Sequence, residues 1–120
     1  MIVHRSAILN VTRLWVLARS NDNTTGFDNT AVGWEAMELN TTGFNNAAFG
    51  WLALTGNVTG SYNTGIGFRA LASANSGSGN TEVGSDAMNN GDLTGSSNIA
   101  LGSDAGVNLS TGDYNIDIGN

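Results

Sequence analysis

A five-residue unit that begins with asparagine and ends with glycine recurs six times along the chain, at intervals of 17, 17, 17, 18 and 17 residues. It first appears as Asn29-Thr-Ala-Val-Gly33 and last as Asn115-Ile-Asp-Ile-Gly119. A fixed short period is typical of a solenoid, in which each repeat forms one coil stacked on the next. A 17-residue unit is too short for a helical hairpin, and its alternation of apolar and turn residues favours two brief strands joined by tight turns.

The sequence therefore predicts an all-β protein, a parallel β-solenoid of about six 17-residue coils over residues 21–120. Residues 1–20 lie outside the repeat and are predicted to be a capping or assembly segment. Their apolar residues follow helical spacing, although the content of Ile, Val, Thr and Trp also permits a strand. A cleaved secretion signal is a competing interpretation, which polar residues such as Asn10 and Arg13 within the apolar run disfavour. The run is also too short and polar to span a membrane.

In a solenoid, residues that are 17 positions apart lie above one another, so each repeat position becomes a column. The large apolar residue before the second glycine is predicted to form an inward-facing core column: Val32, Phe49, Ile66, Val83, Leu101 and Ile118. The later alanine and its Met or Leu neighbour, as in Ala53-Leu54, are predicted to fill the opposite wall. The recurring asparagine is expected to bond its own turn or to form a ladder: Asn29, Asn46, Asn63, Asn80, Asn98 and Asn115. The glycines are expected at sharp corners.

Composition excludes several classes of function. The chain has no cysteine and no proline, so disulfides and thiol-based sites are absent. His4 is the single histidine, it lies outside the repeats, and no nucleophile motif or phosphate-binding loop is present. Residues 21–120 carry all ten acidic residues and only Arg69 as a base, a net charge of −9 that disfavours nucleic acid and anionic membranes as partners. We expect no enzyme, no cofactor and no metal site.

The cycle of Asn-Thr-Ala-Val-Gly (residues 29–33), Ala-Met (36–37) and Asn-Thr-Thr-Gly (40–43) resembles the head repeats of trimeric autotransporter adhesins, the YadA-like family, and related surface and tail-fibre repeats. The resemblance covers residues 23–120. It implies a left-handed parallel β-roll, commonly a homotrimer, that is displayed outside the cell and binds matrix or host surfaces. The repeat here is longer than that of the best-known members. Glu82 and Asp117 are expected on the strand face opposite the apolar column, and they would crowd together if that face lined a three-fold axis.

Aromatic residues gather in the early coils, whereas later equivalents such as Ser78 and Ser85 are mostly serine. This gradient predicts a subunit interface more than a sugar-binding surface, because exposed apolar patches usually mark protein interfaces. The alternative is that the rings pack at corners of their own coils. The candidate interface residues are Phe27, Trp34, Phe44, Trp51, Tyr62 and Phe68.

Three further columns have simpler explanations. The threonines that include Thr25 and Thr42 could form an ice-binding array, but a column of turn hydroxyls explains them better. Asp86 and Asp104 lie at equivalent positions and could share a cation, yet solvated surface acids are the better account. The sequons at Asn10, Asn23, Asn40, Asn57 and Asn108 make glycosylation an open question.

The sequence as a whole predicts an extracellular or cell-surface structural or adhesive protein that self-assembles. Its partner is another copy of itself, in a trimer or in a head-to-tail filament built by addition at an uncapped last coil. The first alternative is an adhesin or fibre head that binds a host or matrix ligand. The second is ice or carbohydrate binding.

Overall fold

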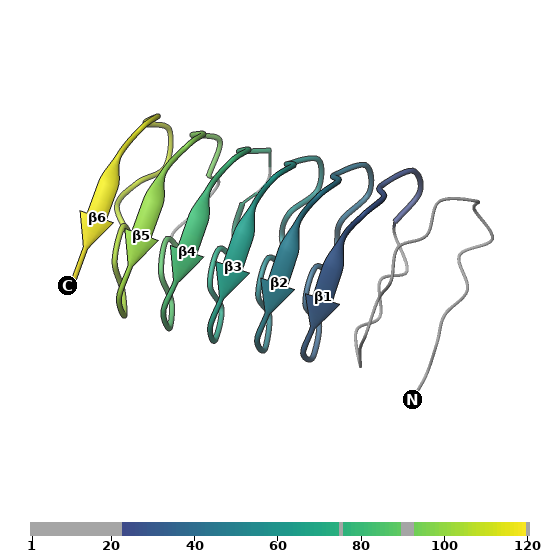
Figure 1. The fold of residues 1–120 in the computed structure, drawn as a ribbon, viewed down its shortest axis with the longest axis horizontal. Coiled ribbons are helices and arrows are strands. Elements are labelled where there is room, and N and C mark those ends of the chain that lie inside the picture. The colour runs from purple at the N-terminus through teal and green to yellow at the C-terminus, as the bar shows by residue number, and fades with distance from the viewer. Residues whose placement is uncertain (1–22, 75, 90–92, 120) are drawn as a thin grey trace.

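The computed structural model of the chain describes residues 23–74, 76–89 and 93–119 (Figure 1). Residues 1–20, whose helical or extended form the sequence leaves open, lie outside the described residues. Six short strands follow one another: β1 (Thr30–Val32), β2 (Ala47–Phe49), β3 (Thr64–Ile66), β4 (Thr81–Val83), β5 (Ile99–Leu101) and β6 (Ile116–Ile118). No helix occurs in the described residues, and so none there could cross a membrane.

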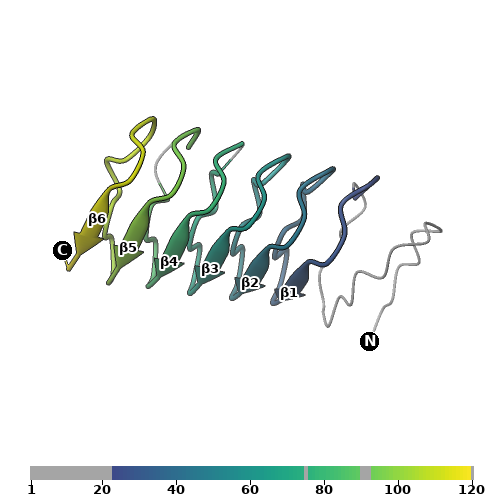
Figure 2. The same ribbon diagram turned by 45° about the horizontal axis from the view of Figure 1, so that its top comes forward.

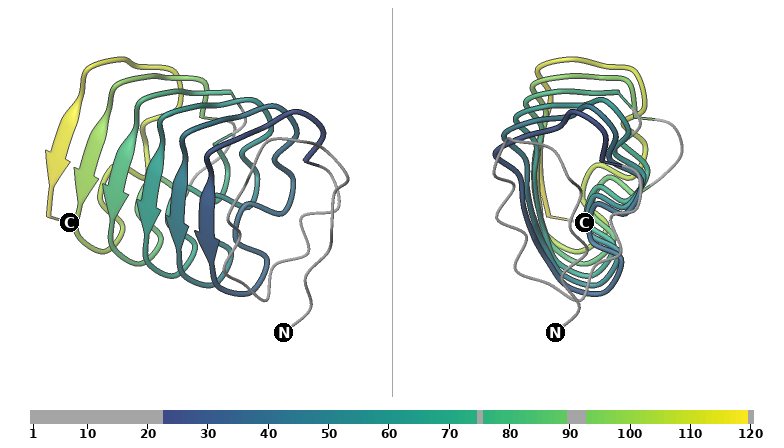
Figure 3. Two further views of the ribbon diagram at one scale, coloured as in Figure 1. Left: turned by 45° about the vertical axis from the view of Figure 1, so that its right-hand side comes forward. Right: turned by 90° about the vertical axis from the view of Figure 1, so that its right-hand side faces the viewer.

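The strands form one parallel sheet in chain order, β1-β2-β3-β4-β5-β6. Figures 1 and 2 show them side by side along one side of the molecule, and the view along the stack in Figure 3 shows each coil lying over the next. The register is an exact repeat, since Val32 pairs with Phe49 and Phe49 with Ile66. The predicted parallel β-solenoid is confirmed, with about five full coils separating the first strand from the last.

The opposite wall of the interior is the predicted one. Alanines of one column and the Met or Leu residues beside them are buried there: Ala36, Ala53, Ala70, Ala87, Ala105, Met37, Leu54, Leu71 and Met88. Within the described part of the 18-residue interval, Leu93 is fully buried and forms a parallel bridge with Ala74.

The core column predicted on the strands is wrong. In each of β1 to β5 the buried residue is the middle one, such as Ala31, Ala48 or Ala100. The predicted column faces outward and is 37–42 % exposed in the first five strands and 71 % exposed in β6: Val32, Phe49, Ile66, Val83, Leu101 and Ile118.

The reason for this reversal is the narrow interior. Side chains alternate between the two faces of a strand, so only one of two neighbouring residues can point inward. Leu and Met residues of the opposite wall already occupy the space: a Cβ built on Gly65 would lie 3.3 Å from Cγ of Leu54. Only a small residue fits at most middle positions, and the large apolar residue is forced outward.

The corners use glycine in two ways, as the sequence suggests. Gly50 follows β2 with φ of +142°, and any side chain there would also collide with the carbonyl of Gly67 in the next coil. Gly43 has no such φ but lies against the carbonyl of Gly60. Residues other than glycine also adopt the left-handed region at recurring positions, for example Leu54 with φ of 54°. These positive φ angles could not be predicted from the sequence, because residues other than glycine rarely adopt this conformation.

Candidate assembly surface

The outward-facing side of the sheet carries two columns of residues, which together we call the outer sheet face. The third residue of each strand supplies the large apolar column described above. The first residue supplies a second column of small or apolar side chains: Thr30, Ala47, Thr64, Thr81, Ile99 and Ile116. None of these twelve residues is charged, although the chain is acidic overall.

The exact register makes this surface continuous. Phe49 of β2 lies between Val32 of β1 and Ile66 of β3, and the same one-to-one pairing runs through to Leu101 and Ile118. At about 4.8 Å between strands, the six residues form an apolar strip roughly 24 Å long. A monomeric soluble protein rarely exposes a contiguous apolar patch of this kind unless it binds something there.

The six predicted interface aromatics fall into two groups of rings, one just before the strands and one just after them, with Tyr62 one position beyond the column of Phe27 and Phe44. Before the strands, Phe27 and Phe44 stack with centroids 4.9 Å apart, and Phe44 meets Tyr62 edge-on at 5.2 Å. After them, Trp51 and Phe68 stack at 4.9 Å. Trp34, Trp51, Tyr62 and Phe68 are exposed. The rings thus lie in two separate ladders, and their role as an interface stays a prediction.

The change from phenylalanine to serine at the Phe27 position comes with a change in the contacts between coils. In the later coils the Phe27 position holds serine, whose hydroxyl accepts a hydrogen bond from the backbone of the previous coil. The N–H of Ser61 donates to Oγ of Ser78, and the N–H of Ser78 donates to Oγ of Ser96, both at 3.1 Å. At this position, ring stacking in the first two coils is therefore replaced by hydrogen bonds between later coils.

The predicted asparagine ladder is present inside the solenoid. The N–H of Asn63 donates to Oδ1 of Asn46 at 2.8 Å, and Oδ1 of Asn63 accepts the N–H of Asn80 at 2.9 Å. Nδ2 of Asn63 donates to the carbonyl of Gly77 at 2.8 Å. The same pattern of N–H to Oδ1 bonds extends from Asn29 to Asn115. Each coil is thereby locked to the next by a buried side chain.

A second ladder was missed by the sequence reasoning, which treated its members as turn residues in sequons. Nδ2 of Asn40 donates to Oδ1 of Asn23 at 3.2 Å, and Nδ2 of Asn57 donates to Oδ1 of Asn40 at 3.0 Å. The side chains of Asn40 and Asn57 are buried, so neither can carry a glycan in the folded coil. Their spacing of 17 residues was the available signal. Asn108, by contrast, is exposed.

One carboxyl group lies inside the solenoid. Glu82 occupies the middle position of β4 and is completely buried. Neither of its carboxyl oxygens has a hydrogen-bond partner among the described residues. Burial raises the pKa of Glu82 from 4.5 to about 9. The backbone N–H of Leu71 opposes this shift but already donates to the carbonyl of Ala87 at 3.1 Å. The carboxyl is therefore protonated at neutral pH.

The expectation that Glu82 and Asp117 lie on the outward face is wrong, for the same reason that reversed the apolar column. Asp117 is the middle residue of β6, and its Oδ2 accepts the N–H of Gly106 at 2.8 Å. The two carboxyl groups therefore do not interrupt the outer sheet face.

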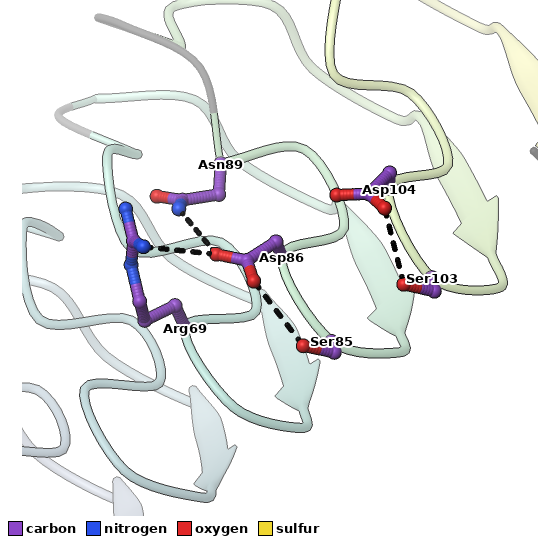
Figure 4. A network of polar contacts seen from close by, with 6 residues as sticks. All are labelled: Arg69, Ser85, Asp86, Asn89, Ser103 and Asp104. Carbon is purple, nitrogen blue, oxygen red and sulfur yellow. Dashed lines mark hydrogen bonds and ion pairs between the residues drawn. The ribbon is translucent and has the colours of Figure 1, made fainter.

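A polar network on the turns joins residues of neighbouring coils (Figure 4). Asp86 receives hydrogen bonds from Ser85 and Asn89 and forms an ion pair with Arg69 at 3.3 Å. Asp104 accepts its bond from Ser103. Within the described parts of the chain, no group of three or more His, Cys, Asp or Glu residues could hold a metal ion.

The threonines considered for ice binding lie outside the sheet. Thr25, Thr42 and Thr59 are exposed turn residues. The chain matches no family model, no curated protein and no solved structure. The 17-residue coil is therefore established by the structure, while the likeness to YadA-like head repeats rests on the repeated motif.

Proposed function

We propose that this protein is a structural β-solenoid that self-assembles by packing the outer sheet face of one copy against other copies. The observation that carries the proposal is the uncharged apolar strip from Val32 to Ile118, which lies on the outside of a sheet whose other face already lines a filled interior.

The energetics favour association through this face. Complete burial of an apolar side chain contributes about 1.5–3 kcal/mol, so side chains that are already about three-fifths buried gain roughly 1 kcal/mol each when a second copy covers them. Five such residues per copy, together with Ile118, which is 71 % exposed, supply several kcal/mol, against which the cost of association must be set. The net charge of −9 elsewhere on residues 21–120 opposes close approach, and added salt should therefore strengthen assembly.

Symmetric closure around the strip gives a homo-oligomer such as a trimer, in accord with the resemblance to trimeric adhesin heads. That resemblance also supports placement outside the cell or on its surface. Because Glu82 and Asp117 point inward, the crowding of carboxylates expected at a three-fold axis is not an obstacle. Head-to-tail growth into filaments stays a prediction.

Two aliphatic residues of similar exposure allow a matched test. Ile66 on the outer sheet face is 41 % exposed and Leu39 on a turn is 45 % exposed. Light scattering coupled to size-exclusion chromatography over a wide concentration range should show an oligomer that Ile66→Ser weakens and Leu39→Ser leaves intact, and that Phe49→Ser/Ile66→Ser dissociates. A wild-type protein that stays monomeric throughout would refute the proposal. Negative-stain imaging separates closed particles from filaments.

A second candidate function is adhesion, because the exposed rings of Trp34, Trp51 and Phe68 offer a stacking surface to a ligand of a host or matrix, including sugar rings. Binding of the purified protein to a glycan or matrix array tests it directly. Trp34→Ser/Trp51→Ser should abolish such binding and leave the oligomer unchanged. If this double variant instead dissociates the oligomer, the rings belong to the subunit interface.

A further inference from the structure

The fourth coil contains a group that is out of place in a solenoid interior. The middle position holds alanine in β1, β2 and β5 and glycine in β3, whereas β4 has Glu82 there. Its partners in the sheet are Gly65 on β3 and Ala100 on β5, neither of which has a polar side chain. Both oxygens of its carboxyl group are buried without a hydrogen-bond partner among the described residues.

No charge faces Glu82 from the elements around it. β3 and β5 contain no titratable residue, and the wall across the interior consists of alanine, leucine and methionine. The charged residues of the facing turns, Arg69 and Asp86, are paired with each other at 3.3 Å on the outside. Asp117, which shares the column, lies two strands away and bonds Gly106. Glu82 is the sole ionisable residue in the buried part of the described chain.

An ionised carboxylate is strongly disfavoured in this position, because it would be a buried charge without a partner, and loss of the proton therefore favours opening of the coil to water. The backbone groups around Glu82 are engaged in ladder bonds, as shown by the N–H of Thr81, which donates to the carbonyl of Asn98 at 2.8 Å. The same coil carries the one extra residue of the repeat, since the interval from Asn80 to Asn98 is 18 residues and the others are 17. Opening at this coil would let water reach the carboxylate.

We propose that Glu82 makes the fourth coil a pH-sensitive opening point of the solenoid: the coil is closed while the carboxyl is protonated and opens when it loses its proton. The direction follows from linkage. The unfolded or opened chain releases the proton at an ordinary acidic pH, whereas the closed coil retains it until alkaline pH. Stability is therefore greatest below about pH 4.5 as far as this group is concerned, falls as the pH rises, and levels off above about pH 9.

Urea unfolding of the full chain between acidic and alkaline pH, at one protein concentration, tests the proposal. For wild type we expect the unfolding constant to rise by up to about tenfold per pH unit between these limits. Glu82→Gln should remove this dependence. Glu82→Ala, which installs the residue found at the same position in β1, β2 and β5, should remove it as well and keeps the test open if the glutamine variant fails to fold. Asp104→Asn is the control and should behave as wild type.

Hydrogen exchange then locates the opening. After correction for the intrinsic dependence of exchange on pH, amides of residues 80–89 should lose protection as the pH rises, while those of residues 46–55 should not. Parallel pH profiles for wild type and both Glu82 variants would overturn the proposal. A wild-type profile that depends on Glu82 but is accompanied by equal loss of protection in all coils would overturn the assignment to the fourth coil.

Discussion

The inner and outer columns of the sheet are one position apart along the chain, and their side chains differ greatly in size. Ala48 points inward and is completely buried, whereas its neighbour Phe49 points outward and is 42 % exposed. In a globular core the larger apolar residue would be expected inside. Here the opposite wall already supplies leucine and methionine, so the width of the interior decides which residue enters. A narrow solenoid thus selects small residues for its strands and leaves large ones for contacts with other molecules.

The largest effect should come from breaking the inner ladder. Asn63→Ala leaves the N–H of Asn80 and the carbonyl of Gly77 buried without the partner that each now has. At about 1–3 kcal/mol for each buried group left unsatisfied, the free energy of unfolding should fall by about 3–5 kcal/mol in urea denaturation. Asn89→Ala on the surface network is the control and should cost less than about 1 kcal/mol. Equal losses would contradict a structural ladder.

The size rule is tested by enlarging a residue inside the coil. Ala48→Leu must displace either the opposite wall or the strand, and overpacking of this kind costs about 1–3 kcal/mol. The matched change outside, Phe49→Leu, should alter the free energy of unfolding by less than about 1 kcal/mol, since its side chain has room to adjust. If the two substitutions cost the same, the interior is wider than the structure indicates.

Truncation on the outer sheet face should affect the fold less than truncation inside. Ile66→Ala should lower the free energy of unfolding of the isolated subunit by roughly 1 kcal/mol, because a 41 % exposed side chain leaves no closed cavity. Leu71→Ala, on the buried wall, should cost about 2–5 kcal/mol. Thermal and urea denaturation at low protein concentration measure both, and the opposite ranking would reverse the assignment of the two sides.

The smallest effect is expected at the surface ion pair. Arg69 and Asp86 are 3.3 Å apart, with side chains 45 % and 28 % exposed. Pairs in such positions contribute about 0–1 kcal/mol and are screened by salt. Arg69→Ala should therefore change the free energy of unfolding by about 0.5 kcal/mol or less, and a loss that persists in high salt would point to packing of Arg69 against Phe68 instead.

The stacking of the coils could be predicted because it depends on spacing alone, and the pairing of Val32, Phe49 and Ile66 follows directly from the 17-residue interval. Which side faces inward could not be decided from apolarity, since a three-residue strand offers too few alternations to reveal its buried face. The small residues at the middle positions were the signal that was overlooked. Glu82 obscured it, because a carboxyl group inside a core is rare.

The positions of the surface residues were harder to predict, because the backbone conformations of the turns cannot be predicted from their sequences. Leu54 and Tyr62 both have positive φ, and this sets where the neighbouring side chains emerge. The six aromatics identified from the sequence lie in two groups, one before the strands and one after them.

In the ladder from Asn29 to Asn115, a backbone N–H of one coil donates to an asparagine Oδ1 of the coil before it at every step. A coil such as residues 46–62 therefore presents to its successor the same groups that it receives from its predecessor. Duplicating or deleting such a block would change the length of the rod by one strand spacing, about 4.8 Å, and leave its cross-section as it was. The number of coils can thus change by whole repeats without a change in the contacts that hold each coil together.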